Sequence, residues 1–318
     1  MSLNKEQDRK VIFLFVPTAV GKNQLLFDFF SGTGEVVNAD SVQVYRQLDI
    51  FSAKADRSIT DRIPHHLIDI LDPWETYNVA DFIRLADKAC SGIWGRGKLP
   101  VVSGGTAFYF KHFMYGLSDA PQSDPETRKT VELFIRDQGL DKAYEYLRLI
   151  DPVSAERINR NDSYRISRAI EVYRASGRPL SSFALPTVPR NDMDVLSIGL
   201  VRDKDELRKR IRSRVDLMFS QGIVDEIRSL LVMGASESWQ SMQGIGYREF
   251  LEKAPSEKAL DGLTKADLDE IREQIVMNSI HYAKRQMTFF RSFSDVRWIN
   301  PEDTEAVGKT IGEFLDQR

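Results

Sequence analysis

The fold is decided by one stretch, Val11-Ile12-Phe13-Leu14-Phe15-Val16-Pro17-Thr18-Ala19-Val20-Gly21-Lys22-Asn23. Its first six residues are a continuous apolar run rich in β-forming types, which predicts a strand buried on both faces, as in a parallel sheet. Residues 23–30 suit a helix. The loop between them ends in Gly21-Lys22. Backbone N–H groups at a helix N-terminus, with an ammonium group beside them, suit a bound phosphate.

This loop departs from the usual phosphate-loop pattern, G-x-x-x-x-G-K-[ST], at both ends. Val16 stands at the first glycine, and Asn23 replaces the hydroxyl residue that would contact Mg²⁺. The setting, after an apolar strand and before a helix, still fits. The pattern alone therefore leaves two interpretations open, a phosphate site and a structural turn with an exposed lysine.

Two further predicted strands, residues 35–38 and 99–103, also end in polar or glycine-rich segments. In open α/β sheets the ligand lies at the carboxyl edge, where such segments meet. Asp40 follows the first of these strands and is a candidate general base, Mg²⁺ ligand or helix cap. Gly104-Gly105-Thr106 follows the second. Its glycines permit close approach of backbone to ligand, or a tight turn, and Thr106 adds a hydroxyl.

Strands alternating with helices predict an α/β fold with a parallel sheet. Helical periodicity is present at 79–92, and a further strand is expected at 195–201, followed by helices at 204–220 and 222–233. After Gly116 the alternation of strands and helices stops. Residues 119–125 predict a loop, and residues 126–182 predict helices without a clear strand. We therefore expect an α/β core of residues 1–117 and 191–318 with a helical insertion domain at 118–190.

Composition excludes several classes of protein. The 318 residues are 42% hydrophobic and 29% charged, as in ordinary globular proteins. No apolar run reaches the ~18 residues of a transmembrane helix, so we expect no membrane partner. The single cysteine, Cys90, excludes a disulfide framework and a cysteine zinc site, and indicates a reducing cytoplasm.

The net charge of −3 conceals an uneven distribution. Basic residues outnumber acidic ones in 157–178, 202–214 and 279–291. Such stretches can form a basic face that binds a polyanion, or they can be solvated helix surfaces.

An ordered series of motifs along nearly the whole chain resembles the tRNA dimethylallyltransferases. Each motif is weak alone, but together and in this order they are highly specific. With one cysteine the chain has no cysteine-rich C-terminal zinc finger, and in this it resembles the bacterial type. The motifs lie at 17–22, 38–41, 43–46, 48–50, 53–54, 64–69, 104–106, 161–172, 210–222, 246–250 and 282–286.

The resemblance implies a P-loop kinase-like core that carries a helical insertion. It implies transfer of a dimethylallyl group from dimethylallyl diphosphate to the exocyclic N6 amine of the adenosine 3′-adjacent to the anticodon, with release of diphosphate. The implied cofactor is Mg²⁺, and the implied partners are the tRNA anticodon stem-loop and dimethylallyl diphosphate. We expect a monomer.

The resemblance also assigns roles to single residues. The catalytic set comprises Asp40 as general base, Thr106 as the link between the pocket and the phosphates, and Lys22 as a diphosphate contact. With Asp40 as the general base, Asn23 is the candidate Mg²⁺ ligand. The diphosphate-binding set is Thr18, Ala19, Val20, Gly21, Lys22, Asn23, Arg210 and Arg214. The tRNA-binding set is Asp40, Ser41, Val42, Gln43, Tyr164, Arg165, Ile166, Ser167, Arg168, Gln243, Gly246, Tyr247, Arg248, Lys284 and Arg285.

The chain departs from the family pattern at Val16, Asn23, Phe51 and Phe289. A Cβ at position 16 disfavours positive φ, and Asn23 lacks the hydroxyl that would contact Mg²⁺. We therefore expect both residues to weaken diphosphate binding. Two alternatives remain. One is a kinase or isopentenyltransferase that acts on free adenine nucleotides, and the other is a tRNA-binding paralogue with a decayed phosphate loop.

Overall fold

The computed structural model describes residues 9–317. The chain divides into two compact units, residues 1–114 with 190–318 and residues 115–189. The sequence predicts the insertion at 118–190, and residues 1–8 of the predicted core lie outside the described residues.

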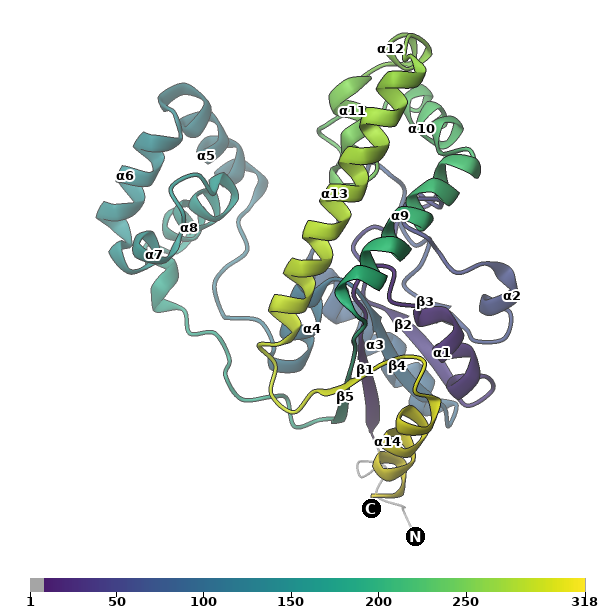
Figure 1. Ribbon diagram of the computed structural model, residues 1–318. Coiled ribbons are helices and arrows are strands. Elements are labelled where there is room, and N and C mark those ends of the chain that lie inside the picture. The colour runs from purple at the N-terminus through teal and green to yellow at the C-terminus, as the bar shows by residue number, and fades with distance from the viewer. Residues whose placement is uncertain (1–8, 318) are drawn as a thin grey trace. The chain divides into compact units, whose positions relative to one another are not determined.

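The first unit is built on a six-stranded sheet in the order β3-β2-β4-β1-β5-β6, in which every pairing is parallel (Figure 1). The predicted parallel α/β fold is confirmed. Because β4 lies between β2 and β1, the loops that follow these three strands meet at one edge of the sheet. The strands are β1 (Lys10–Phe15), β2 (Gly34–Asn38), β3 (His65–His66), β4 (Leu99–Gly104), β5 (Asp194–Leu200) and β6 (Arg297–Ile299).

Strand β1 is the centre of the core. Its residues 11–15 are fully buried, because the strand pairs with β4 on one side and β5 on the other. Ile12 and Leu14 enter one apolar cluster. Phe15 stacks on Phe290 at 4.7 Å between ring centroids. The last turn of the long helix α13 (Lys265–Phe290) therefore packs on the strand that leads into the phosphate loop.

The helices of this unit begin at recognisable caps. Asn78 accepts hydrogen bonds from two backbone N–H groups at the start of α3, and Thr264 with Asp267 forms a capping box at the start of α13. Helix α13 packs beside α9 and α11 (Figure 1). The helices are α1 (Lys22–Phe30), α2 (Arg57–Thr60), α3 (Val79–Gly95), α4 (Ala107–Tyr115), α9 (Lys204–Ser220), α10 (Ile223–Val232), η2 (Gln240–Gln243), α11 (Arg248–Lys253), α12 (Glu257–Asp261), α13 (Lys265–Phe290) and α14 (Thr304–Asp316).

The second unit consists of helices around its own apolar cluster. Val131, Leu147 and Ile170 are fully buried in that cluster. Asp124 caps helix α5 (Pro125–Gln138). Pro125 follows at the first helical position, where a backbone N–H would have no partner within the helix. The elements are α5 (Pro125–Gln138), α6 (Leu140–Ile150), α7 (Pro152–Arg157), α8 (Ser163–Ser176) and η1 (Leu180–Ser182).

No helix among residues 9–317 is long and apolar enough to cross a membrane.

Candidate active site

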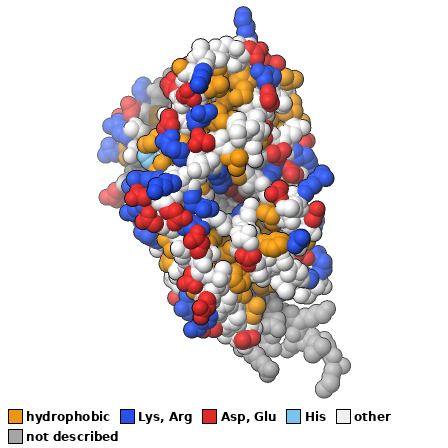
Figure 2. Space-filling view, turned by 45° about the vertical axis from the view of Figure 1, so that its right-hand side comes forward, with side chains coloured by type: hydrophobic (Ala, Val, Ile, Leu, Met, Phe, Trp, Pro, Cys, Tyr) orange, Lys and Arg blue, Asp and Glu red, His pale blue; other side chains and the backbone are white. Residues whose placement is uncertain are grey.

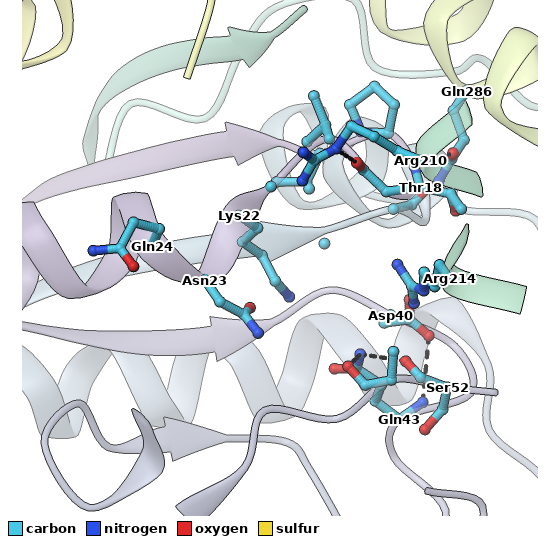
Figure 3. A pocket seen from close by; sticks show the side chains of 18 of the residues that line it. Thr18, Lys22, Asn23, Gln24, Asp40, Gln43, Ser52, Arg210, Arg214 and Gln286 are labelled. Carbon is cyan, nitrogen blue, oxygen red and sulfur yellow. Dashed lines mark hydrogen bonds between the residues drawn. The ribbon is translucent and has the colours of Figure 1, made fainter. Parts of the chain in front are cut away.

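A cleft of about 830 Å³ opens at the carboxyl edge of the sheet. Its wall includes the 16–24 segment, the glycines after β4 and one side of α9. Among residues 9–317, four cations line the cleft and Asp40 is the one acidic residue in its wall, a composition that suits a polyanion. Figure 3 shows Lys22 and Arg214 converging on this space from α1 and α9. The cations are Lys22, Lys209, Arg210 and Arg214.

The phosphate loop is held in shape by two arginines from outside it. Arg210 donates through Nε to the Ala19 carbonyl at 2.9 Å, and Arg202 donates through Nε to the Val20 carbonyl at 2.6 Å. Ala19 and Gly21 have positive φ, +65° and +105°. A Cβ at Gly21 would lie 3.3 Å from Arg210, so both conformation and space require glycine there. The sequence does not single out Arg202, because only the fold brings its basic segment to the loop.

The positive φ that the phosphate-loop pattern suggests at position 16 is absent, so this reason for weaker diphosphate binding is wrong, and the effect on binding stays a prediction. Val16 is not among the residues with positive φ. Its N–H donates to the Gly104 carbonyl at 3.1 Å, which extends the pairing of β1 with β4 by one residue, and its side chain is buried in the core. The unusual backbone conformation falls three residues later, at Ala19.

Two of the four cations, Lys22 and Arg214, are half-buried, whereas Lys209 and Arg210 are exposed. Burial lowers the pKa of Lys22 and that of Arg214. The Asp40 carboxylate acts in the opposite direction on both, while Arg214 lowers the pKa of Lys22 further. An anion bound between these cations would offset their mutual repulsion.

Asp40 holds a turn with one carboxylate oxygen and keeps the other oxygen free; no helix of the described residues begins there, so the expected helix cap is wrong. One oxygen accepts hydrogen bonds from the N–H groups of Val42 at 2.8 Å and Gln43 at 3.3 Å. Among residues 9–317, its second oxygen has no hydrogen-bond partner. The first oxygen thus fixes the side chain in the turn after β2, and the second stays available for chemistry.

Thr106 ties the turn after β4 to the turn after β2. Its hydroxyl accepts from the Ser41 N–H at 3.1 Å, and its own N–H donates to the Ala39 carbonyl at 3.1 Å. This contact needs Gly104, since a Cβ there would lie 2.2 Å from the Ala39 oxygen. Thr106 therefore positions the segment that carries Asp40.

Gln286 of α13 joins two of the three loops. Its Oε1 accepts from the Thr18 N–H at 3.0 Å, and its Nε2 donates to the Gly105 carbonyl at 2.8 Å. The side chain is buried. Gln286 ends the motif at 282–286, but the family resemblance gives this residue no role of its own. A second sequence signal is its position as a polar residue on the apolar face of a helix.

A second cavity of about 610 Å³ adjoins the first. The two share Thr18, Asp40, Ser52 and Arg214 as lining residues. The second cavity has a mixed wall, in which a group of apolar side chains lies among polar and charged ones. The apolar group comprises Val42, Phe51, Ile211, Val215, Met218, Ile245 and Ile275.

Several residues predicted to bind tRNA surround this second cavity, and others do not. Tyr247 is fully buried and donates through its hydroxyl to Glu226 at 2.8 Å, so the prediction that it contacts tRNA is wrong. Gly246 is also buried, because the ring of Phe51 covers it. Gln43 is buried and donates to the Ser52 carbonyl at 2.7 Å, which gives it a structural task. The predicted residues that line the cavity are Asp40, Ser41, Val42, Gln243, Arg248 and Arg285.

The predicted tRNA contacts of the insertion lie on α8. Tyr164 is 81% exposed and Arg165 is exposed beside it, as a contact residue requires. Ile166 lies in the apolar cluster of this unit, so its predicted tRNA contact is wrong. Helical spacing turns its side chain inward. Ser167 is half-buried. Arg168 donates to the Pro121 carbonyl at 2.8 Å and the Ser123 hydroxyl at 2.7 Å, which fixes the segment leading into α5.

Salt bridges neutralise part of the basic stretches. Arg160 pairs with Asp141, and Arg212 pairs with Glu273. On the face shown in Figure 2, basic and acidic side chains are interspersed. Among residues 9–317, Lys284 and Arg285 have no acidic partner, and both are exposed on α13.

A phosphate loop at the edge of a parallel sheet, facing a cationic cleft that contains a carboxylate, defines a group-transfer enzyme of the P-loop class. The model of the IPP transferase family matches residues 43–293. A tRNA dimethylallyltransferase from Borrelia turicatae is 43% identical over 92% of this chain and 95% of its own. A tRNA dimethylallyltransferase 2 from Geotalea uraniireducens is 38% identical over 98% of each chain.

Solved structures agree with these relatives. A tRNA isopentenylpyrophosphate transferase from Bacillus halodurans matches with a TM-score of 0.65 and 34% identity, over 97% of this chain and 98% of that one. A eukaryotic dimethylallyltransferase acting on tRNA matches with a TM-score of 0.73 and 25% identity, over 96% and 77%. The chain belongs to the tRNA dimethylallyltransferase family, and it is a transferase.

Proposed function

We propose that this protein transfers a dimethylallyl group from dimethylallyl diphosphate to the N6 amine of the adenosine 3′-adjacent to the anticodon in tRNA, releasing diphosphate. The observation that carries the proposal is the position of Asp40, which lines both the cationic cleft and the second cavity beside it. The names of the relatives support the same reaction.

The cleft suits the diphosphate end of the donor. Lys22, Arg210 and Arg214 place positive charge where the leaving diphosphate gains negative charge as the carbon–oxygen bond breaks. The N–H groups at the start of α1 add partial positive charge. The apolar side chains within the mixed wall of the second cavity suit the dimethylallyl tail and the face of a purine ring.

Mg²⁺ fits this site as a partner of the substrate rather than as an ion held by the protein alone. No group of three or more metal-binding side chains lies together among residues 9–317. Asn23 lines the cleft, and an amide oxygen with phosphate oxygens and waters is a donor set that Mg²⁺ accepts. When bound, the ion would neutralise charge on the diphosphate.

The acceptor amine would approach from the second cavity. The bond from N6 to the dimethylallyl carbon forms as the bond to the diphosphate oxygen breaks, and the proton lost by the amine passes to the free oxygen of Asp40. The adenosine must leave the loop stack to reach this oxygen, at a cost of a few kcal/mol that is smallest in a single-stranded loop.

We take the protein to be a cytoplasmic monomer. The lone thiol fits a reducing compartment, since Cys90 is buried in α3 and burial raises its pKa to about 12.

One assay separates the three candidate functions. Purified protein is incubated with labelled dimethylallyl diphosphate, Mg²⁺ and either unmodified tRNA or free AMP. Label in tRNA alone is the expected result. Label in AMP would instead support an enzyme of free nucleotides. Binding of tRNA without transfer to either acceptor would support a non-catalytic paralogue.

A further inference from the structure

Two tryptophans form an exposed aromatic patch on the first unit. Trp74 lies in the loop before α3, and Trp239 lies just before η2. Their ring centroids are 5.9 Å apart with planes inclined at 65°. Trp74 is 54% exposed and Trp239 is half-buried. Scattered single apolar residues on a surface need no explanation, but two indoles in contact form a larger patch that suits a partner.

The patch is held rigidly. Gln240 accepts from the Tyr77 N–H at 2.9 Å and donates to the Tyr77 carbonyl at 2.7 Å. The buried hydroxyl of Ser241 donates to the Pro73 carbonyl at 2.6 Å. These three hydrogen bonds fasten the loop that carries Trp74 to the turn that carries Trp239. A surface ordered in advance loses little entropy when a partner binds.

The patch adjoins the second cavity through Gln240. Gln240, the residue between Trp239 and Ser241 that holds the two segments together, lines that cavity together with Asp40. The charged neighbours of Trp74 in its loop are acids, Asp72 and Glu75, and Asp72 pairs with Arg46. The acidic side chains around Trp74 therefore favour binding of an uncharged aromatic ring over binding of a phosphate group.

We propose that Trp74 and Trp239 stack on an unpaired base of the tRNA anticodon loop, next to the target adenosine. This inference rests on the proposed function. When the adenosine leaves the loop stack, its neighbour loses a stacking partner, and an indole of the patch beside Gln240 replaces that partner. Unpaired RNA bases bind aromatic side chains in this way.

The first test measures binding of an unmodified anticodon stem-loop RNA to the full-length protein. We expect Trp74→Ala and Trp239→Ala each to weaken binding by roughly 5–100-fold, the range typical for loss of one stacked base. The KM for tRNA should rise with kcat unchanged, because stacking is the same in ground and transition states. Trp74→Phe should keep most of the affinity. Leu315→Ala, which removes an exposed apolar side chain on α14, is the matched control.

The second test replaces each unpaired loop nucleotide in turn with an abasic one. The wild-type protein should lose affinity at one position beside the target adenosine, and Trp74→Ala should show no further loss at that position. A smaller dependence of affinity on salt in Trp74→Ala would indicate a phosphate contact and overturn the proposal. Unchanged affinity in both alanine variants, with wild-type transfer to tRNA intact, would also overturn it. Failure of the wild type to bind or modify tRNA would overturn the proposed function itself.

Discussion

Asp40 combines a structural and a chemical task in one side chain, and the two can be separated. Asp40→Asn keeps an oxygen to accept the N–H groups of Val42 and Gln43 but removes the proton acceptor. We expect turnover to fall by about 10²–10⁴-fold with tRNA affinity largely kept. Single-turnover transfer of label to tRNA measures the first quantity, and a binding titration measures the second. Normal turnover in this variant would mean that Asp40 only holds the turn through its hydrogen bonds to Val42 and Gln43.

The two departures in the phosphate loop should behave differently when reverted. Asn23→Thr restores a hydroxyl at the start of α1, and we expect it to lower the KM for dimethylallyl diphosphate. Val16→Gly should not lower that KM, because Val16 has ordinary backbone geometry. It should reduce the free energy of unfolding by about 2–4 kcal/mol, through lost core packing and added backbone freedom. Steady-state kinetics and urea unfolding check both, and a lower KM in Val16→Gly would contradict this account.

The strand pattern predicts the residues of this site that follow strands, the family resemblance adds Arg210 and Arg214 of α9, and Arg202 and Gln286 are missed. Lys22, Asp40 and Thr106 come directly after buried strands, so the geometry of a parallel sheet places them at one edge. Arg202 and Gln286 reach the phosphate loop from 182 and 268 residues away along the chain. Their positions depend on packing of helices, which no local pattern encodes. Tyr247 and Ile166 show the reverse error, since a motif does not tell a buried face from an exposed one.

Helix α13 acts as a brace for the two loops beneath its last turns. Gln286→Ala would leave the Thr18 N–H and the Gly105 carbonyl without partners in a buried place. We expect kcat/KM for dimethylallyl diphosphate to fall by roughly 5–100-fold, with tRNA affinity unchanged. Gln274→Ala on the exposed face of the same helix is the control. Equal effects of the two substitutions would argue against a brace.

The same helix should also provide phosphate contacts. Lys284 and Arg285 are exposed without acidic partners among residues 9–317, whereas Arg212 is paired with Glu273. If the first two contact tRNA phosphates, alanine at either should reduce the slope of log affinity against log salt by ~0.7–0.9. Arg212→Ala should leave that slope unchanged. A salt series on the three variants decides the matter, and equal slopes throughout would refute phosphate contact by this part of α13.

The sequence predicts the bounds of a helix or strand well where its local pattern is strong. Helix α9 is found at Lys204–Ser220, as the sequence predicts, because Asp203 caps it and its apolar residues recur at helical spacing. Strands β3 and β6 contain two and three residues and escape prediction. They are strands because neighbouring strands offer them pairing partners, not because their own residues demand it.

For the molecule as a whole, the stability of the first unit should depend on pH through Glu35 on β2. Its carboxylate is buried, and its oxygens accept hydrogen bonds from Arg96 at 2.6 and 2.9 Å and contact His66 at 2.7 Å. Hydrogen bonding to Arg96, followed by that to His66, lowers the pKa of Glu35 from 4.5 to about 2 against the opposing effect of burial. The ionised form is therefore favoured in the folded state.

Because the folded pKa is the lower one, this stabilisation is complete above about pH 4.5 and is lost as the pH falls toward about 2. Glu35→Gln should be less stable than the wild type near neutral pH, and the difference in unfolding free energy should shrink as the pH falls through that window. Urea unfolding followed by circular dichroism over a pH series measures the difference. Glu132→Gln, at an exposed position of the insertion, should match the wild type throughout. A constant difference for Glu35→Gln would mean that the charge of Glu35 contributes nothing, and that only the shape of its side chain matters.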